Sequence, residues 1–416
     1  MPSLDNHEFQ AETAMGQMAG EDAAIIELRN DVIAHIDSLR LPNRAGGDSD
    51  KELIRYSHAF QRREVVKREL RAIGSRANYL LNYFANGDEI VPEGIQPELV
   101  PVSSDDWTGY LFRFASLLWS VPVSHGYGRR MRFLVLDQHN GKLIGIFALG
   151  DPVFNLQCRD QWIGWSSDDR RERLVHLMDA YVVGAVPPYN QILGGKLIAS
   201  LIGSGGVSEA FLQKYGSSTG IISGEKKRAR LALVTVTSAL GRSSLYNRLK
   251  LHDGAGNTLV ELVRLGETKG YGHFQLSDEL FERIRRLLIS ENHPYADGYR
   301  FGQGPNWRFR VLREGLKRLG LDEELIRHGI HREVFGMPMT PEFRDFLCGR
   351  QREIDLRRPS IEEITKAALN RWMIPRSIHR PEFRQFRREE VMSRIQFGMA
   401  EPIPGEFRAG CSRPRH

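Results

Sequence analysis

The sequence predicts an α+β fold, in which a mixed β-sheet has flanking helices, plus N-terminal and C-terminal helical regions. An Asn-Gly turn joins two strand-like runs, Arg130–Asp137 and Lys142–Leu149, which is the strongest short signal for a β-hairpin. An apolar run at Ala180–Val186 has the length of a buried strand and stops at two prolines, and the spacing after it predicts a helix at Gly194–Leu201. A strand rich in Val and Thr follows at Arg230–Thr237. We expect these strands to share one sheet, which the 194–201 helix covers.

Three longer helical patterns precede the hairpin, and a short one at Asn78–Phe84 lies between the second and the third. The first two, Ala24–Leu39 and Asp50–Gly74, are separated by a linker rich in Pro, Gly, Asn and Asp. In the second, Arg62 and its basic neighbours are mixed with glutamates, which is typical of an exposed helix. The third, Trp107–Ser120, is strongly apolar and leads into the turn before the hairpin.

The chain beyond the central strands divides into a further strand and then helices. Thr258–Leu265 predicts a strand that ends at Gly266, and Asp278–Ile289 predicts an amphipathic helix with Ser277 as its N-cap. From Asn292 onward the pattern changes to helices punctuated by Gly and Pro. We therefore expect a mobile leader at 1–23, an N-terminal helical region at 24–106, a core at 107–290 and a C-terminal helical, basic region at 291–416.

Composition favours a globular protein of the cytoplasm. The chain has 416 residues, of which 41% are hydrophobic, and its three cysteines are far apart, which gives no disulfide framework and no cysteine zinc site. The histidines show no metal-binding spacing, so no metal site is predicted. The longest apolar stretch, Leu111–Val123, contains Arg113 and is too short to span a membrane, and residues 1–20 lack the apolar segment of a signal peptide. We expect no membrane partner.

The positive charge lies at the C-terminal end. Residues 350–416 contain fifteen Lys or Arg and nine Asp or Glu, a difference equal to the net charge of +6 for the whole chain. Basic residues interleaved with Trp372, Phe383 and Phe386 suit a phosphate backbone, whereas a solvated helical face with i,i+4 ion pairs is the alternative. The candidate nucleic-acid-binding residues are Arg376, Arg380, Arg384, Arg387 and Arg388.

The loop between the central strand and its helix is the first candidate ligand site. A helix N-terminus preceded by glycine offers free N–H donors to an anion, and the alternative is a tight turn with close packing. The candidate ligand-binding residues here are Tyr189, Asn190, Gln191, Gly194, Gly195 and Lys196. The loop after the next strand adds hydroxyl groups and a guanidinium on the opposite wall, from Ser238, Arg242, Ser243 and Ser244.

Two further residues are candidates for catalysis. Asp151 follows the hairpin where a substrate would enter a splayed sheet, and an Asp-Pro turn capped by side chains is the alternative. His273 lies beside a glycine-rich loop, and the alternative for it is a turn histidine at a strand start.

The order of these elements resembles the GNAT family of N-acetyltransferases. Gln191 and Gly194 match the pyrophosphate loop of that family, Gln/Arg-x-x-Gly-x-Gly/Ala, while Lys196 stands where the family has Gly or Ala. The resemblance implies a GNAT-like core, Tyr246 as a catalytic general acid and an acyl coenzyme A as a candidate cofactor. Lys196 either contacts a phosphate directly or fills the space, so the cofactor stays open.

A closer resemblance covers residues 50–394. The strings GYGRRMRFLV, GKLIGIFALGDPVFNLQCRDQWIGWS, DAYVVGAVPPYNQILGGKL, TSALGRSSLYNRL and GETKGYGHFQL resemble the DruA family of the Druantia anti-phage defence system. The core of that family is similar to Mom-type enzymes, which modify adenine in phage DNA. The resemblance implies a partner among the other defence-system proteins and nucleic acid as a ligand, with DNA favoured over RNA.

Three hypotheses about function follow from these observations. The first is a GNAT-related transferase that modifies nucleic acid, the second is a non-catalytic nucleic-acid sensor or adaptor, and the third is a conventional acyl-CoA-dependent N-acyltransferase. The basic C-terminal region favours the first two, and Lys196 argues against the third.

Overall fold

The computed structural model describes residues 23–37, 51, 54–55, 58–123, 128–219, 224, 226–268, 276–296, 305–326 and 331–397. The chain divides into two compact units, one made of residues 1–53 and 269–330 and the other of residues 54–268 and 331–416. The four-region division expected from the sequence stays a prediction, and each unit is described below by itself.

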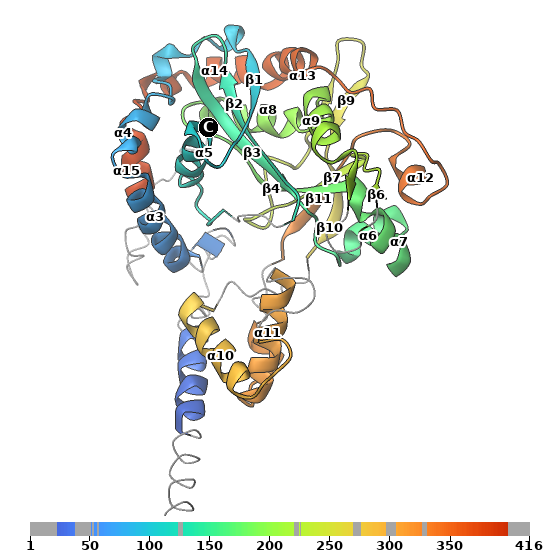
Figure 1. Cartoon of the computed structure of the whole chain (residues 1–416). Coiled ribbons are helices and arrows are strands. Elements are labelled where there is room, and N and C mark those ends of the chain that lie inside the picture. Colours follow the sequence, from blue (N-terminus) through green and yellow to red (C-terminus); the bar gives the residue numbers. More distant parts are fainter. Residues whose placement is uncertain are drawn as a thin grey trace, which may run out of the picture. The chain divides into compact units, whose positions relative to one another are not determined.

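The larger unit contains a seven-stranded mixed sheet (Figure 1). Every neighbouring pair is antiparallel except β4 and β7, which run parallel. The predicted α+β class and mixed sheet are therefore confirmed. In spatial order the strands are β1 (Pro97–Pro101), β2 (Arg130–Asp137), β3 (Lys142–Gly150), β4 (Leu177–Ala185), β7 (Leu233–Thr237), β11 (Glu333–Pro338) and β10 (Val263–Glu267).

The predicted hairpin and the predicted splay are both present. β2 and β3 pair from Arg130 opposite Gly150 to Asp137 opposite Lys142, and Gly141 has the positive φ of 70° that this turn requires. The parallel pairing of β4 with β7 covers only Leu177–Ala180, whereas β4 continues to Ala185 beside β3 alone. The two strands therefore part after Ala180.

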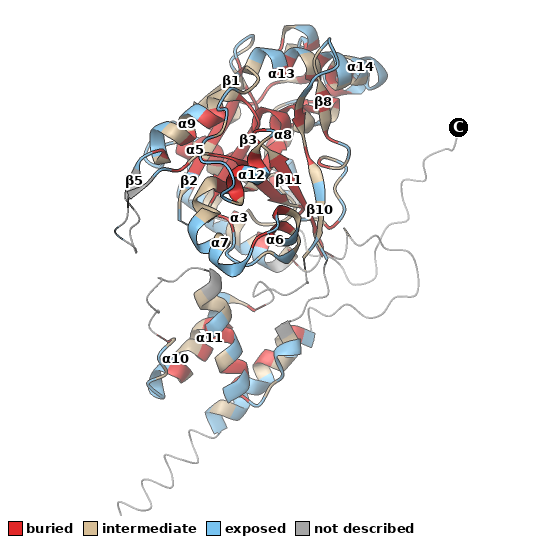
Figure 2. Ribbon diagram, turned by 90° about the vertical axis from the view of Figure 1, so that its right-hand side faces the viewer, coloured by how far each residue is buried: buried red, intermediate tan, exposed pale blue. Residues whose placement is uncertain are grey.

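Successive side chains along each strand point to opposite faces of the sheet, so the sheet has one part of the core on each face. On one face, Phe133 of β2 and Met178 of β4 pack with Leu197 of α8 (Gly194–Leu201), as predicted for the covering helix. On the other face, Leu134 of β2 and Val182 of β4 pack with residues of α3 (Ala59–Ile73) and α5 (Trp107–Ser116). Figure 2 shows how completely β3 and α8 are buried.

Shorter elements complete the larger unit. Two small antiparallel pairs stand beside the main sheet, β5 (Ser218–Thr219) with β6 (Lys226–Lys227) and β8 (Lys250–His252) with β9 (Thr258–Glu261). The remaining α-helices are α4 (Arg76–Leu81), α6 (Gln157–Ile163), α7 (Ser167–Arg173), α9 (Gly205–Tyr215), α12 (Phe343–Leu347), α13 (Ile361–Ala368), α14 (Ile374–His379) and α15 (Glu390–Phe397). The 3-10 turns are η1 (Gly87–Glu89), η2 (Pro92–Gly94), η3 (Leu174–His176), η4 (Tyr189–Ile192) and η7 (Pro381–Gln385), and η6 (Leu369–Met373) is a π-helix.

Three details of the predicted sheet are wrong. The strand predicted at Arg230–Thr237 begins only at Leu233. The single strand predicted at Thr258–Leu265 is two strands, β9 and β10, because the chain passes between two sheets at the buried Leu262. The strand β11 lies in the region predicted to be helical, and its pairing with β7 and β10 places it inside the main sheet.

The smaller unit is helical among the residues described. Residues 23–37 form a helix, and Val32 in it shares a core with Ile284 of α10 (Asp278–Ser290) and Leu312 of α11 (Pro305–Arg318). Ser277 caps α10 by accepting a hydrogen bond from Leu280 N at 3.2 Å, as predicted. A 3-10 turn, η5 (Glu323–Ile326), follows α11.

The C-terminal segment is part of the core of the larger unit. Phe383 is fully buried, and Met373 and Val391 are buried with it. In every part of the chain that the structure describes, no helix is long and apolar enough to cross a membrane.

Candidate functional site

The turn into α8 is tightly packed. Leu193 adopts a left-handed conformation at φ 65°, and a Cβ on Gly194 would lie 2.7 Å from Tyr189 O. A Cβ on Gly195 would lie 3.1 Å from Leu245 Cδ1 of the loop after β7. Packing against the backbone therefore requires glycine at position 194, whereas a side chain at position 195 would have to displace only the end of Leu245, by a few tenths of an ångström.

These contacts bear on acyl coenzyme A. A pyrophosphate at this helix end needs open backbone N–H groups. The end of the Leu245 side chain lies near Gly195, on the side where a Cβ would point. Acyl coenzyme A at this turn therefore stays a candidate.

Lys196 is held against the C-terminal segment. Its Nζ lies 5.2 Å from the ring centroid of Trp372, and the guanidinium carbon of Arg371 lies 5.8 Å from the same ring. Burial lowers the pKa of Lys196, and the positive charge of Arg371 lowers it further. We call Lys196, Arg371 and Trp372 the Trp372 cluster. The Trp372 cluster therefore joins the candidate ligand loop before α8 to the basic C-terminal segment, two regions far apart in the sequence.

A local irregularity in the helix presents Trp372. The helix from Ile361 to His379 runs as α13, η6 and α14, with the π-helical turn in the middle. Pro375 lies at the start of α14 and has no N–H to give to the carbonyl four residues earlier, at Arg371. A widened turn accommodates the proline, and such π-bulges are frequent at functional sites.

The paired part of β4 and β7, just before the two strands separate, contains a carboxyl group that sequence reasoning missed. Thr235 Oγ1 donates a hydrogen bond to Asp179 Oδ1 at 2.6 Å. Burial raises the pKa of Asp179 to about 6, although this hydrogen bond and the charge of Arg159 act in the opposite direction. The available signal was an aspartate within an otherwise apolar strand sequence.

Tyr246 lies near this carboxyl group. It is buried, with its ring 5.8 Å from that of Phe335. Burial raises the pKa of the Tyr246 hydroxyl, and the charge of Asp179 raises it further. The predicted general acid, Tyr246, therefore stays protonated at neutral pH. The carboxyl group of Asp179, whose charge acts on it, has a pKa of about 6, close to neutral pH.

The other candidates on the α8 wall differ in accessibility. Tyr189 is fully buried, and its hydroxyl donates to Asp137 Oδ2 at 2.8 Å and accepts from Asn140 Nδ2 at 3.0 Å. These contacts favour a structural role at the hairpin turn. Asn190 is exposed and Gln191 is half-buried.

On the opposite wall, two of the candidates organise the loop after β7. Ser243 Oγ accepts hydrogen bonds from Leu245 N and Tyr246 N, at 3.2 and 3.4 Å. Ser238 is buried, and its backbone N–H donates to Glu333 O of β11. Arg242 and Ser244 are exposed.

Asp151 is paired with an arginine that ties strand ends together. Its carboxylate accepts from Arg129 N at 2.9 Å and from Arg129 Nε at 2.7 Å, while the same guanidinium donates to Val175 O and Leu177 O. This agrees with the alternative of a capped turn, and the catalytic role stays a prediction. His273 lies outside the described residues.

The five candidate arginines of the C-terminal segment separate into two groups. Arg387 and Arg388 form ion pairs with Asp88 and Glu89 of η1. Of the other three, Arg376 of α14 is half-buried and Arg384 of η7 lies 5.1 Å from the ring centroid of Phe383. Arg380 lies between α14 and η7 and pairs with the exposed Glu382. Within the described part of the chain, no three His, Cys, Asp or Glu residues are grouped so as to hold a metal ion.

Comparisons with known proteins agree with the motifs. The family described as "Druantia protein DruA" matches residues 48–349. A protein of that name from Escherichia coli (strain UMEA 4076-1) is 46% identical over 375 residues, which cover 89% of this chain and 92% of the relative. No solved structure matches. The chain belongs to the Druantia DruA family.

Proposed function

We propose that this protein is the DruA component of a Druantia anti-phage defence system and that it recognises nucleic acid, with DNA preferred to RNA. Family membership supports the first part of the proposal. For the second part, the supporting surface is the Trp372 cluster together with Arg376 of α14, Arg384 of η7 and Arg380 between them.

One observation carries the proposal: two cations from distant parts of the chain approach the same indole ring. Lys196 and Arg371 carry like charges beside one ring, and the charge of Arg371 adds to burial, the larger cause, in lowering the pKa of Lys196. An anion placed between them would remove that repulsion, and a phosphate is the anion that a cluster of Lys and Arg binds best. The indole adds a surface on which a base stacks without regard to sequence.

The experiment measures the binding of labelled single-stranded and duplex DNA by fluorescence anisotropy over a range of salt concentrations. Trp372→Ala is expected to weaken single-strand binding by about 5- to 100-fold, the range for loss of one stacked base. Lys196→Gln is expected to reduce the magnitude of the salt slope by about one, because one phosphate contact is lost.

Lys366→Gln is the matched control, since it removes an exposed lysine of α13 without touching the Trp372 cluster. The same variants are tested for phage defence in cells. Binding and defence at wild-type levels in folded Trp372→Ala and Lys196→Gln proteins would refute the proposal.

A second candidate function is GNAT-related modification of nucleic acid at the splay. The observation that favours it is a carboxyl group with a pKa of about 6 near a buried tyrosine, because a general base works best when its pKa lies near the working pH. Mass spectrometry of nucleosides from cells is expected to show a modified base with the wild type and none with Asp179→Asn. Identical nucleosides in both would leave the sensor or adaptor hypothesis.

A further inference from the structure

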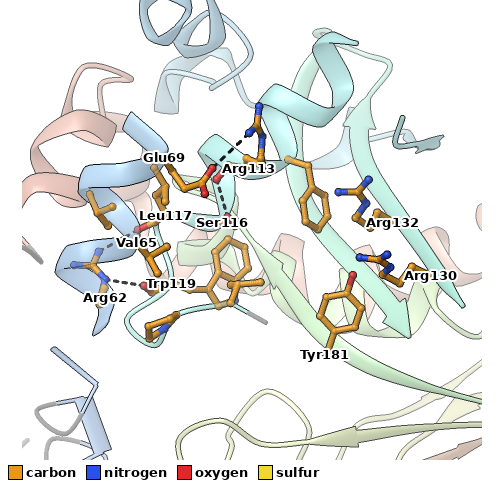
Figure 3. Close-up of a pocket in the computed structure, with 14 residues that line it drawn as sticks. Arg62, Val65, Glu69, Arg113, Ser116, Leu117, Trp119, Arg130, Arg132 and Tyr181 are labelled. Carbon is orange, nitrogen blue, oxygen red and sulfur yellow. Dashed lines mark hydrogen bonds and ion pairs between the residues drawn. The ribbon is translucent and has the colours of Figure 1, made fainter. Parts of the chain in front are cut away.

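A second site lies on the face of the sheet opposite α8. A cavity of about 110 Å³ opens between α3, α5 and the strands β2 and β4. Figure 3 shows Arg62, Glu69 and Trp119 on one side of it and Arg130, Arg132 and Tyr181 on the other. The full lining is Arg62, Val65, Val66, Glu69, Phe112, Arg113, Ser116, Leu117, Trp119, Pro122, Val123, Arg130, Arg132 and Tyr181.

Three polar atoms of this lining are buried and have no hydrogen-bond partner among the described residues: Arg62 Nη1, Glu69 Oε2 and Tyr181 Oη. Arg62 is only 7% exposed, and its other two nitrogens donate to Trp119 O at 2.9 Å and Leu117 O at 3.0 Å. Glu69 Oε2 forms an ion pair with Arg113 Nη1 at 3.6 Å but accepts no hydrogen bond, whereas the other carboxylate oxygen, Oε1, accepts from Arg68 Nε and Nη2 at 3.3 Å. Orphaned polar atoms are costly in a folded protein, so their grouping around one cavity points to a ligand.

The prediction that Arg62 is an exposed charge is wrong. The structure buries its guanidinium against the carbonyl groups of Leu117 and Trp119, which follow α5. A buried guanidinium with one free nitrogen is a directed donor, not a solvated surface charge.

The strand β4 is built to aim Tyr181 at this cavity. The register between β3 and β4 shifts where Val182 pairs with Ala148 but Ala180 pairs with Leu149, so Tyr181 is the extra residue of a β-bulge. Bulges of this kind re-aim a side chain next to active sites. The Tyr181 ring also lies close to Gly150 of β3, where an added Cβ would approach it to 3.2 Å.

The neighbouring wall depends on another glycine. A Cβ on Gly184 would lie 2.7 Å from Trp119 Cζ2, so only glycine lets the indole reach the sheet at this point. Trp119 and Tyr181 thereby present aromatic surface to the same cavity.

We propose that this cavity binds a nucleotide whose base carries an exocyclic amino group. Four guanidinium groups face one carboxylate in the lining, which selects an anionic ligand. Glu69 accepts from the amino group, Arg62 Nη1 and Tyr181 Oη bond to ring acceptors, and aromatic side chains cover the ring. Arg130 and Arg132 of β2 hold the phosphate.

The size of the cavity agrees with one ring system. Its volume of about 110 Å³ is well below the ~300–1,000 Å³ of sites that enclose a whole drug-sized ligand, so it takes only part of a nucleotide. The sugar and phosphate therefore stay at the mouth, where Arg130 is exposed and Arg132 is half-buried. A free nucleotide and an unstacked base of a single strand share this chemistry.

In the experiment, the full chain is titrated with dCMP, dAMP, dTMP and inorganic phosphate, and calorimetry measures the binding of each. We expect dCMP or dAMP to bind more tightly than dTMP, whose base has no amino group, and inorganic phosphate to bind weakest. Tyr181→Phe is expected to weaken nucleotide binding about five- to tenfold while leaving the melting temperature unchanged or higher, because it removes a buried hydroxyl without a partner. Tyr79→Phe, which removes an exposed hydroxyl of α4, is the matched control.

The two sources of the base are separated by competition. Displacement of a labelled single strand by dCMP or dAMP assigns the cavity to a base of the strand, and nucleotide binding without displacement assigns it to a free nucleotide. The proposal is overturned if no nucleotide binds, if phosphate or dTMP binds as tightly as the others, or if Tyr181→Phe binds like the wild type.

Discussion

At the scale of single residues, burial decides the chemistry of the titratable groups. Asp179 has a pKa of about 6 because it is removed from water, whereas the carboxylate of the exposed Asp355, beside Arg357, has a pKa lowered to about 2. His58 and His176 show the same effect for a base, since burial lowers the pKa of each to about 4. Both imidazoles are therefore neutral at pH 7.

The raised pKa of Asp179 predicts how stability depends on pH. Its pKa of about 6 in the folded protein exceeds the 3.8 of an aspartate in water, so its contribution to stability is favourable at low pH and is lost as pH rises through 6. Asp179→Asn is expected to raise the free energy of unfolding by about 1–2 kcal/mol at pH 8, and the gain should vanish near pH 4.

Urea unfolding at a series of pH values measures this difference. Thr235→Val is the matched variant, because losing the Thr235 hydrogen bond raises the pKa of Asp179 further and destabilises the protein at pH 8. A gain in Asp179→Asn that is the same at pH 4 and pH 8 would contradict the assignment.

At the scale of elements, the arginines of the C-terminal segment have different roles, because some form ion pairs within the fold and others are exposed. Arg388 pairs with Glu89, and its backbone N–H donates to Asn86 Oδ1 at 3.0 Å, which ties the start of α15 to η1. Arg384 of η7 is exposed and lies over the ring of Phe383. Equal charge therefore does not mean equal function.

This difference predicts opposite results for two alanine variants. Arg388→Ala is expected to lower the free energy of unfolding by about 1–2 kcal/mol, since a half-buried network loses its central donor, with little change in the salt slope of DNA binding. Arg384→Ala is expected to keep wild-type stability and to reduce the salt slope by about one. Denaturation and anisotropy on the same preparations measure both, and a reversed pattern would exclude η7 from the DNA-binding surface.

At the scale of the whole molecule, the basic C-terminal segment contributes exposed arginines to the surface and apolar side chains to the core. Truncation after Arg350 would remove five of the six excess positive charges, because residues 351–416 contain fourteen Lys or Arg and nine Asp or Glu. It would also remove Phe383, Val391 and Ile395, which are buried in the larger unit. A loss of DNA binding in the truncated protein would therefore not distinguish a lost binding surface from a lost fold. Point substitutions in the Trp372 cluster and in η7 change the binding surface without removing the core residues.

The sequence alone determined the features that a few neighbouring residues encode. The Asn-Gly turn of the β2–β3 hairpin, the strand that stops at the two prolines, the helix that starts at Gly194 and the Ser277 cap all depend on local conformational preference, and all four are present. The family was equally readable, because its motifs are contiguous strings.

Only the tertiary structure decided which distant residues meet and which are buried. Strand β11 was missed because its place depends on pairing with β7 and β10, not on its own pattern. The approach of Lys196 to Trp372, the raised pKa of Asp179 and the orphaned atoms of Arg62 and Tyr181 come from the packing of segments far apart in the chain. Desolvation and side-chain proximity are properties of that packing, so no local pattern contains them.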